Sequence, residues 1–415
     1  MSTRRRLSIA IRPALAAAII TGCSVSESVS PPVTQPPPPP PPPPSVEARA
    51  LWVSRFEFDS PEKITRIMDD ARSANFNIVY FQVRGAADAI YRSSIEPCAV
   101  VLCGRLGGTA TWDPLEVAVR EAHARGLELH AWLNAFTGVG SGAASTCATL
   151  VESASGNPRH ILKEHPEWAM VDDAGVSMPC PNNEEYVWLS PGNPGVRTQL
   201  ARVAADVVRR YGVDGIHLDR IRYPGTRWSY DPASLAEFGK SPGSDPGGWA
   251  QFRRDLVGRA VREAFDSVVA VRPATVLSVA AWGIYQDKWG WNSSQGYSQY
   301  LQDPRAWAKD GYLDVTVPMT YFAINSASCS FADWICLLED HLRGVQAATG
   351  RDMYIAIAAN KGSPESLRQV QAGRAYGVKG FAFYSYASAS AANLFTALAA
   401  GPFNAKASIP RMSWR

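Results

Sequence analysis

Short apolar runs alternate with longer amphipathic stretches from residue 48 onward. The runs are rich in Val, Ile, Phe, Tyr and Trp, and they are continuously apolar, which is typical of parallel strands that are covered on both faces. Each run is followed by a stretch in which apolar residues recur at helical spacing. The pattern predicts eight strands, at residues 49–56, 77–85, 127–136, 213–224, 274–283, 313–322, 352–362 and 378–387.

The stretches between the strands carry the signals of helix termini. Ser60 can cap the first of them, Pro61 suits its first turn, and Ile64, Ile67 and Ala71 follow at helical spacing. Helices are therefore predicted at residues 60–76, 112–126, 196–212, 248–271, 297–312, 331–350, 363–377 and 390–400.

Eight strands, each followed by a helix, predict a (β/α)8 TIM barrel. An open, doubly wound sheet is the alternative. That fold places a GxGxxG motif after its first strand, whereas the first strand here is followed by a turn without glycine. We therefore expect a barrel over residues 48–400 and a short tail over residues 401–415.

Residues 1–22 are typical of a secretory signal peptide, because three arginines precede an apolar segment. The segment ends in Ile-Thr-Gly-Cys, which resembles a bacterial lipobox and predicts lipidation of Cys23; an ordinary signal peptide with a chance cysteine is the alternative. Residues 23–47 include nine consecutive prolines, which favour a stiff tether over a ligand for a partner domain. We expect an exported protein with a lipid anchor at the cell envelope, on the periplasmic face or the outer membrane if the cell is Gram-negative.

Composition narrows the set of partners. The formal net charge is only +3 and no dense basic patch is present, so nucleic acid is not expected as a partner. No stretch after the signal segment is apolar for long enough to cross a bilayer. The 13 Trp and 15 Tyr residues can form core, and they are also the rings on which sugar-binding clefts stack pyranoses.

The cysteines other than Cys23 form an even set, which indicates disulfides in an exported chain. A metal site is the rival interpretation, but no CxxC motif is present, so neither a metal nor another cofactor is expected. The sequence leaves the pairing open, and nearest neighbours would join Cys98 with Cys103, Cys147 with Cys180, and Cys329 with Cys336.

Polar and aromatic side chains gather at the predicted carboxyl ends of the strands, where barrel enzymes hold their active sites. Asp219 directly follows the apolar run of the fourth strand and is the candidate catalytic carboxylate. Arg220 is expected at the surface or between layers, whereas Asp214 and Asp314 lie at strand starts and should tie backbone amides at the opposite end of the barrel. The candidate substrate-binding residues are Gln82, Arg84, Asp88, Trp132, Asn134, His217, Arg222, Tyr223, Trp282, Tyr321 and Tyr384.

For two of these residues a purely structural role is the alternative to a functional one. His217 can equally be an inward-facing barrel residue whose hydrogen bonds are satisfied. Asp219 can serve only to pair with Arg84 or Arg222, although a nearby arginine would also favour the charged form that a catalytic carboxylate needs.

Long motifs of this chain resemble the glycosyl-hydrolase-like family ten, namely ALWVSRFEF, FNIVYFQVRGAADAIYRSSIEP, WDPLEVAVREAHARGLELHAWLNAF, HPEWAM, LSPGNPGVR, GVDGIHLDRIRYP and GFAFYSYAS. They occur in order over nearly all of residues 48–390. The resemblance implies a TIM-barrel glycoside hydrolase of the kind that bacteria export, often as a lipoprotein. Some members of the family are implicated in cleaving peptidoglycan glycan strands without peptides, so such a strand is the expected polysaccharide substrate.

The chitinases of family eighteen carry a related fourth-strand motif, DGxDxDxE. DGIHLDRI lines up with it, so that His217 and Asp219 stand at its second and third acidic positions and Ile221 at its glutamate. This chain therefore lacks the acid of that family, and a second carboxyl group has to come from another strand.

A glycosidase needs two carboxyl groups that flank the scissile bond. Glu57, at the end of the first strand, is predicted as the acid opposite Asp219, because the phenylalanines on both sides of it would limit solvent and favour its protonated form. Glu57 can instead pair with Arg55, and Asp88 and Asp287 are further candidates for the acid.

Two functions from different classes fit these features. The first is a membrane-anchored glycoside hydrolase, in which Trp132, Trp282, Trp289 and Trp291 provide stacking platforms for sugars. The second is a non-catalytic glycan-binding barrel that is tethered at the cell envelope.

Overall fold

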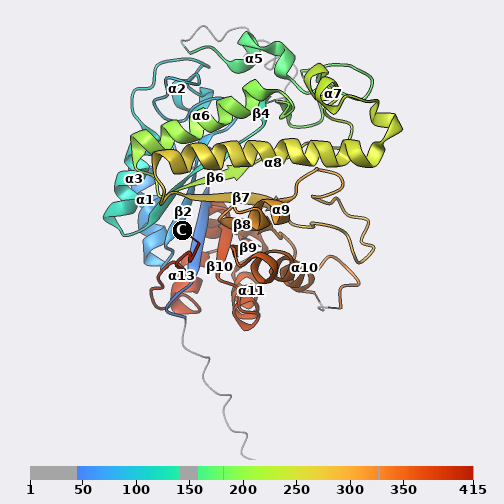
Figure 1. The fold of residues 1–415 in the computed structure, drawn as a ribbon. Coiled ribbons are helices and arrows are strands. Elements are labelled where there is room, and N and C mark those ends of the chain that lie inside the picture. The colour runs from blue at the N-terminus through green and yellow to red at the C-terminus, as the bar shows by residue number, and fades with distance from the viewer. Residues whose placement is uncertain (1–43, 141–157, 181, 326–327, 415) are drawn as a thin grey trace, which may run out of the picture. The chain divides into compact units, whose positions relative to one another are not determined.

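The computed structural model describes residues 44–140, 158–180, 182–325 and 328–414, and at its centre is a closed parallel barrel (Figure 1). All eight predicted strands are present, and they follow one another around the barrel in chain order until β10 pairs with β1. They are β1 (Ala48–Val53), β2 (Ile78–Arg84), β3 (Glu128–Asn134), β6 (Gly215–Asp219), β7 (Val276–Trp282), β8 (Val315–Met319), β9 (Asp352–Ala358) and β10 (Gly380–Tyr384). The predicted (β/α)8 TIM barrel is therefore confirmed.

The apolar side chains of the strands divide into two layers, one inside the barrel and one beneath the helices. Trp52 belongs to the cluster inside the barrel with Tyr80 and Trp132, whereas Leu51 and Val79 belong to the outer cluster beneath the helices. Because successive side chains of a strand point to opposite faces, a continuously apolar run fills both layers at once.

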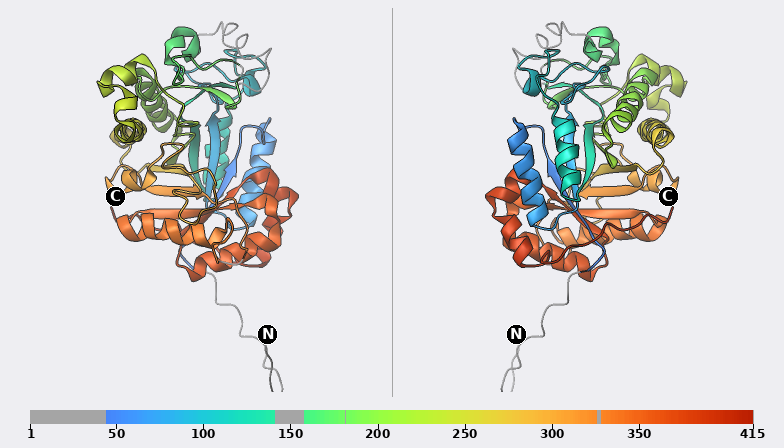
Figure 2. Two further views of the ribbon diagram at one scale, coloured as in Figure 1. Left: turned by 90° about the vertical axis from the view of Figure 1, so that its right-hand side faces the viewer. Right: turned by 90° about the vertical axis from the view of Figure 1, so that its left-hand side faces the viewer.

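Helices surround the strands (Figure 2) and begin where the caps in the sequence indicate. The side chain of Ser60 accepts a hydrogen bond from the Lys63 amide at the start of α1, and Asp113 caps α3 in the same way. The helices are α1 (Pro61–Ser73), α2 (Val100–Cys103), α3 (Pro114–Ala124), α5 (Ile161–Glu164), α6 (Pro194–Tyr211), α7 (Pro232–Phe238), α8 (Pro246–Val271), α9 (Pro304–Lys309), α10 (Trp334–His341), α11 (Ser363–Ala375), α12 (Tyr386–Ala391) and α13 (Leu394–Ala400). Short 3-10 helices are η1 (Pro166–Trp168), η2 (Pro242–Ser244) and η4 (Ala359–Lys361), and the π-helix η3 (Leu342–Ala347) continues α10.

Two predicted helices differ in extent. The helix expected over residues 297–312 begins only at Pro304, because the side chain of Asp303 caps it there. The helix expected over residues 390–400 is divided into α12 and α13, because Asn393 adopts a left-handed backbone conformation, with φ of 50°, that an α-helix does not continue through.

Between β3 and α6 the chain leaves the barrel and forms a small antiparallel sheet of β4 (Thr137–Gly140) and β5 (Tyr186–Trp188). Figure 1 shows β4 near α5 in the upper part of the view. Because β4 follows directly after the carboxyl end of β3, the excursion begins at the end of the barrel where the candidate site residues gather. We call this carboxyl end the mouth and the opposite end the floor.

Two of the predicted disulfides are confirmed, Cys98–Cys103 and Cys329–Cys336. Cys180 is also disulfide-bonded. Cys147, its predicted partner, lies outside the described residues.

Aspartates and the C-terminal segment close the floor. Oδ2 of Asp214 accepts a hydrogen bond from the Leu129 amide at 2.8 Å, and Oδ2 of Asp314 accepts one from the Leu277 amide at 2.8 Å. The two aspartates thus tie strand starts together, as predicted. The indole of Trp414 donates to Oδ1 of Asp314 at 3.0 Å, so the end of the predicted tail contacts the barrel floor.

The signal peptide over residues 1–22, the lipidated Cys23 and the proline run of the tether are predictions for residues outside the described part, apart from the last proline, Pro44. In the part that the structure does describe, no helix has the length and apolar character needed to cross a bilayer.

Candidate active site

A pocket of about 290 Å³ opens at the mouth, and its wall draws on every barrel strand, or the loop after it, except β9. The sequence-predicted residues that line it are Gln82, Trp132, Asn134, Asp219, Arg222, Tyr321 and Tyr384. The rest of the wall consists of Trp52, Ser54, Arg55, Phe56, Tyr186, Arg220, Ala280 and Met319.

Asp219 ends β6 in the wall of the pocket, and its side chain is 14% exposed. Oδ1 accepts a hydrogen bond from the Arg220 amide at 2.5 Å and lies 3.4 Å from Nη1 of Arg222. The ion pair with Arg222 is one of the two pairings expected for Asp219. Within the described residues no donor reaches Oδ2, so one carboxylate oxygen is left for a ligand.

His217 lies beneath the pocket instead of in its wall. The ring is fully buried and stacks on Tyr80, with centroids 4.1 Å apart. Nε2 accepts the indole N–H of Trp52 at 3.0 Å, so Nδ1 carries the proton and donates to Ser278 Oγ at 2.9 Å. Burial lowers the pKa of His217 to about 3, although Asp219 opposes the shift, and the ring is neutral. The structural explanation therefore replaces the predicted substrate contact, and His217 positions Trp52.

Two amide side chains of the wall are held by hydrogen bonds. Oδ1 of Asn134 accepts the indole N–H of Trp132 at 3.0 Å, and Nδ2 of Asn134 donates to the Gly85 carbonyl at 3.1 Å. Oε1 of Gln82 accepts from the Arg55 amide at 2.9 Å, which leaves its Nε2 for a ligand oxygen. Side chains that are already ordered lose little rotamer freedom when they bind a sugar hydroxyl group.

Tyr321 and Tyr384 form the aromatic side of the pocket. Their rings stack with centroids 5.5 Å apart, and Trp52 meets Tyr384 edge-on at 6.0 Å. Burial raises the pKa of both phenols, and the negative charge of Asp219 raises them further. Both hydroxyl groups therefore keep their protons at neutral pH and can donate hydrogen bonds beside an apolar ring face.

Trp282 supports Arg222 and does not line the pocket. The guanidinium of Arg222 lies 5.2 Å from the centre of the Trp282 ring, whose N–H donates to the Ser294 carbonyl at 2.7 Å. Trp289 and Trp291 stack on each other at 4.3 Å and also lie outside the wall. Of the predicted stacking platforms, Trp132 alone lines this pocket.

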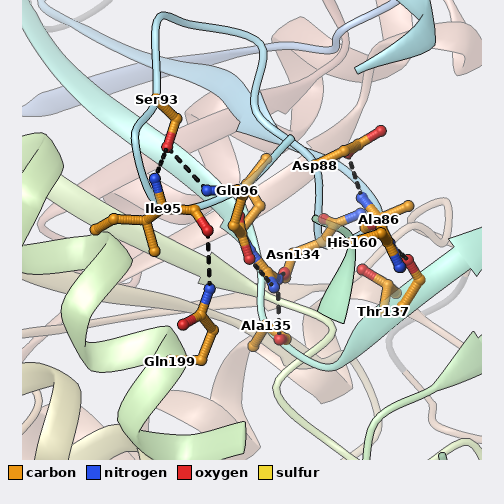
Figure 3. Close-up of polar contacts among 12 residues, drawn as sticks. Ala86, Asp88, Ser93, Ile95, Glu96, Asn134, Ala135, Thr137, His160 and Gln199 are labelled. Carbon is orange, nitrogen blue, oxygen red and sulfur yellow. Dashed lines mark hydrogen bonds and ion pairs between the residues drawn. The ribbon is translucent and has the colours of Figure 1, made fainter. Parts of the chain in front are cut away.

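Arg84 binds Glu96 and not Asp219. Its guanidinium donates to Glu96 at 2.8 Å and also to the backbone carbonyls of Asn134 and Ala135. Figure 3 shows Glu96, Asn134 and Ala135 gathered around these bonds. The side chains of Arg84 and Glu96 are each 1% exposed, so the pair ties the loop after β2 to the end of β3 and makes no substrate contact.

Asp88 and Asp287 cap turns. Oδ1 of Asp88 accepts from the Ala86 amide at 2.7 Å (Figure 3). Oδ1 of Asp287 accepts from the Trp289 amide at 3.1 Å; burial alone would raise the pKa of Asp287, but hydrogen bonds from backbone amides outweigh it and lower the pKa. Asp88 lines a neighbouring cavity, but neither residue lines this pocket, so neither is placed to protonate a sugar that is bound at Asp219.

Tyr223 belongs to the core. Its side chain is fully buried, its amide donates to the Tyr300 carbonyl at 3.0 Å, and the Arg253 guanidinium lies 5.9 Å from its ring centre. The substrate contact predicted for Tyr223 is therefore not possible in this structure.

Glu57 is enclosed by three donors. Oε2 accepts from the Ser54 amide at 2.5 Å, and Oε1 accepts from Ser385 Oγ at 2.6 Å and from the Ala387 amide at 2.7 Å. The carboxylate joins the loops after β1 and β10, but it is not part of the pocket wall. Glu57 is 9% exposed, as its expected burial requires, but of the two phenylalanines that were expected to shield it only Phe58 is buried and Phe56 is 69% exposed. This is the geometry of a positioning residue, and it lends no support to the predicted acid role.

Three polar residues of the wall, other than serine, were not among the candidates predicted from the sequence. Arg55 lies in the loop after β1, Tyr186 in β5, and Arg220 directly after Asp219. Arg220 was expected at the surface or between layers, but its left-handed backbone, with φ of 51°, allows successive residues to face the pocket. Position toward the carboxyl end of a predicted strand could have indicated both arginines, whereas Tyr186 carries no local signal.

The wall of the pocket combines charged, polar and aromatic groups. Asp219 is its only carboxylate as far as the described residues show. The described residues also contain no group of three His, Cys, Asp or Glu side chains that could hold a metal ion. One carboxylate, three guanidinium groups, two ordered amides and three phenols can bind the hydroxyl groups and ring of a sugar and act on it from one side.

Residues 47–366 match the model of the family described as glycosyl hydrolase-like 10. This chain belongs to that family. The resemblance expected from the motifs is confirmed, and the family-10 match runs from before β1 into α11. It therefore includes all the strand ends of the mouth except that of β10, which carries Tyr384.

Relatives of this family-10 chain are named glycosyl hydrolases. "Glycosyl hydrolase YngK" from Bacillus subtilis (strain 168) is 27% identical over 314 residues, which are 69% of this chain and 57% of the relative. "Glycosyl hydrolase DigH" from Escherichia coli (strain K12) is 25% identical over 394 residues, which are 88% of this chain and 85% of the relative. The chain thus spans little more than half the length of YngK.

Solved structures share the architecture. The PgaB (BpsB) glycoside hydrolase domain from Bordetella bronchiseptica superposes with a TM-score of 0.60 at 15% identity and covers 85% of this chain and 99% of that one. Alpha-L-fucosidase isoenzyme 2 from Paenibacillus thiaminolyticus gives 0.59 at 14% identity and covers 86% and 49%. At these identities the likeness shows the fold alone, which is the TIM barrel of these glycoside hydrolases.

Proposed function

We propose that this protein hydrolyses O-glycosidic bonds in a cell-envelope polysaccharide, and that its substrate is a peptidoglycan glycan strand without peptides. The observation that carries the proposal is Asp219, which faces the mouth of a family-10 barrel with one carboxylate oxygen unoccupied. An active site is expected at this end of the barrel because the loops after all eight strands converge there. The names of the relatives support the reaction, and the family motifs support the strand as substrate.

Each part of the wall has a role in this proposal. Asp219 is the reacting carboxylate, and Arg222 holds it toward the pocket. Gln82 and Tyr384 donate hydrogen bonds to sugar oxygens, and Tyr321 offers its ring to the apolar face of the sugar. The positions of these groups are set by residues outside the wall, such as His217 and Glu57, so the site is ordered before the substrate arrives.

A non-catalytic glycan-binding barrel is the second candidate, and one observation favours it. Most glycosidases have two carboxyl groups about 5 to 10 Å apart. The described wall of this pocket has one. Such a barrel would bind strands at the cell envelope without cleaving them.

Product analysis tests the proposal and separates the two candidates. The compact unit Pro43–Arg415 would be incubated with intact and with peptide-free peptidoglycan, and the soluble products analysed by mass spectrometry. We expect saccharide fragments from the peptide-free strands only, and none when Asp219→Asn replaces the unsubstituted protein. Binding of strands without any release of fragments would reject hydrolysis and support the glycan-binding barrel.

We also propose that Cys23 carries a lipid that anchors the exported protein, with the proline-rich segment as its tether. The lipobox-like sequence before Cys23 supports this. Labelling of growing cells with radioactive palmitate should mark the protein, and Cys23→Ser should abolish the label. A Cys23→Ser protein that still sediments with membranes would show that another element holds it there.

A further inference from the structure

Positive charge dominates the wall of the pocket. Arg55, Arg220 and Arg222 face it, against the single carboxylate of Asp219. The guanidinium of Arg222 already has two partners: Nη1 lies 3.4 Å from Oδ1 of Asp219, and the group lies over the ring of Trp282. Burial lowers the pKa of Arg222 and the charge of Arg220 lowers it further, although Asp219 opposes both. An anion that entered the pocket would relieve this crowding of like charges.

Arg55 forms no ion pair within the described residues. Its amide donates to Gln82, and Nη2 lies 3.4 Å from the hydroxyl of Tyr186. Nη1 is enclosed and has no hydrogen-bond partner in the part of the chain that the structure describes, and it lies over Gly85, where an added Cβ would come within 1.8 Å of it. Glycine at position 85 therefore makes room for a partly buried guanidinium, which costs free energy unless a ligand supplies the opposite charge.

Arg220 approaches the same tyrosine. Its Cζ lies 5.5 Å from the ring centre of Tyr186. Its ion-pair partner is Glu185 at 2.7 Å, but that side chain is 64% exposed, so water screens the pair and it contributes little. Tyr186 thus links two guanidinium groups that face one pocket. The enclosed carboxylate that acts on Arg220 is Asp219, which already pairs with Arg222.

We propose that Arg55 and Arg220, linked through Tyr186, bind a carboxylate group that the sugar substrate carries. The inference rests on the glycoside hydrolase function proposed above and gives it a substrate class, namely glycans with a free carboxylate close to the bond at Asp219. Guanidinium groups suit this role because their planar forks match both oxygens of a carboxylate. We call the two arginines the carboxylate clamp.

The clamp lies where a glycan can extend past it. Arg55 and Phe56 line the pocket and also a neighbouring cavity of about 130 Å³, which reaches toward Val101 and His160. A strand that runs from one cavity into the other would pass the clamp, so each acidic sugar could be recognised within a longer chain.

This chemistry would produce the preference for strands without peptides that is proposed above. In intact peptidoglycan the lactyl carboxyl group of muramic acid is joined to the peptide as an amide, which removes its charge and adds bulk. Removal of the peptide exposes the carboxylate. A uronic acid, whose carboxylate is attached to the ring, presents the same group and is the other source that the clamp would accept.

Four probes separate these possibilities. The unit Pro43–Arg415 with Asp219→Asn, which prevents turnover, would be titrated by calorimetry with peptide-free strands, with the same strands after conversion of their carboxyl groups to methylamides, with oligogalacturonate and with neutral chito-oligosaccharide. The strands should bind about 10- to 100-fold more tightly than their methylamides, as expected for hydrogen bonds to a charged group.

Substitutions assign the effect to the clamp. Arg55→Gln should lose about 10- to 100-fold in affinity for the strands but less than about threefold for the methylamides, and Arg220→Gln should show the same pattern with a smaller loss. Arg55→Lys keeps the charge without the fork and should fall between. Arg120→Gln, at a 63% exposed position on α3, is the matched control and should change neither affinity. Unchanged thermal unfolding midpoints would show that each variant is folded.

The outcomes distinguish the clamp from the proposed function. Equal binding of strands and methylamides, or an equal loss on both in Arg55→Gln, overturns the clamp, while cleavage of the strands by the unsubstituted protein leaves the hydrolase function standing. If oligogalacturonate alone binds tightly and Arg55→Gln abolishes this binding, the clamp is supported and peptidoglycan is rejected as the substrate. Binding of none of the four probes, together with no cleavage of the strands by the unsubstituted protein, overturns both.

Discussion

Asp214 and Asp219 stand at the two ends of one barrel strand, and their surroundings differ. Asp214 precedes β6 at the floor, where Oδ2 accepts from the Leu129 amide and contacts Nε2 of His123, both at 2.8 Å. Asp219 ends β6 at the mouth, where one oxygen meets the Arg220 amide and the other has no donor among the described residues. The side chain at the floor is satisfied by the protein, and the one at the mouth is not.

Hydrogen-bond partners, and not exposure, separate the two carboxylates. The side chain of Asp219 is 14% exposed and that of Asp214 is 33% exposed, so the carboxylate with fewer partners is the more enclosed. A carboxylate that is largely enclosed and keeps one oxygen without a protein donor is typical of a position that serves function more than stability. Asp314 repeats the floor arrangement with the Leu277 amide, which indicates that the floor is built for stability.

The largest effect should come from replacing each of the two carboxylates, Asp214 and Asp219, separately by an amide. Asp219→Asn should lower turnover at least about 1000-fold and leave the free energy of unfolding within about 1 kcal/mol of the unsubstituted value. Asp214→Asn should do the reverse, with turnover per folded molecule retained and about 1–3 kcal/mol of stability lost. Product release and urea unfolding measure the two quantities.

A loss of turnover below about tenfold in Asp219→Asn would be too small for a reacting carboxylate, since tenfold is only about 1.4 kcal/mol of barrier. Asp219 would then be a substrate contact or a structural residue, and the contrast between mouth and floor would no longer be one of function.

The second largest effect should be a loss of stability in acid, caused by two buried histidines, His217 in β6 and His341 in α10. Burial lowers the pKa of His217 to about 3 and that of His341 to about 4. In the unfolded chain both should titrate near about 6.5. Because the unfolded state then binds more protons, the free energy of unfolding should fall as the pH falls from about 6.5 toward 4. At about pH 5 the loss should be on the order of 2 kcal/mol for each histidine.

Urea unfolding at about pH 7.5 and pH 5 measures this loss. His217→Gln should remove the share that belongs to His217, whereas His165→Gln, at a 42% exposed position, should leave the pH dependence as it is. A free energy of unfolding that does not change between the two pH values would contradict a buried, neutral imidazole beneath the mouth.

A smaller effect is expected at Glu57, which belongs to the mouth by position but has its carboxylate satisfied like those of the floor. Glu57→Gln turns an amide donor toward the Ser54, Ser385 and Ala387 donors and should displace the loops after β1 and β10. Hydrolysis of the natural strand and of an aryl glycoside with a good leaving group should slow by the same factor, about 10- to 100-fold.

The leaving group is the control in this experiment. An aryl glycoside needs little protonation and the natural strand needs much, so a loss confined to the strand would support the acid role predicted from the sequence. Ser385→Ala removes one donor and keeps the carboxylate, and it should cause a smaller loss that is equal on both substrates.

The smallest effect should come from the disulfides of the mouth. Cys98–Cys103 and Cys329–Cys336 close loops that follow β2 and β8, with separations of only 5 and 7 residues. In the chain-entropy model such short loops stabilise by about 2 kcal/mol each, less than a long-range bridge would. Replacing either pair by serines should lower the free energy of unfolding by about that amount. Free thiols at these positions in the unreduced, unfolded protein would contradict the bridges.

The sequence alone determined the barrel and much of its mouth. Apolar runs, helix caps and turn residues are local signals, so the eight strands, the start of α1 at Ser60 and the position of Asp219 at a strand end could all be predicted. The floor aspartates could be predicted for the same reason, because a carboxylate at a strand start lies next to the amide of the neighbouring strand.

The tertiary structure decided which polar groups meet. Arg84 pairs with Glu96, Glu57 is bound by a loop that lies more than 300 residues away in sequence, and Tyr186 reaches the mouth from a sheet outside the barrel. Periodicity places a side chain on a face, but a hydrogen bond requires two particular atoms within about 3 Å of each other. Barrel closure and the course of the loops set those distances, and both depend on the whole chain at once.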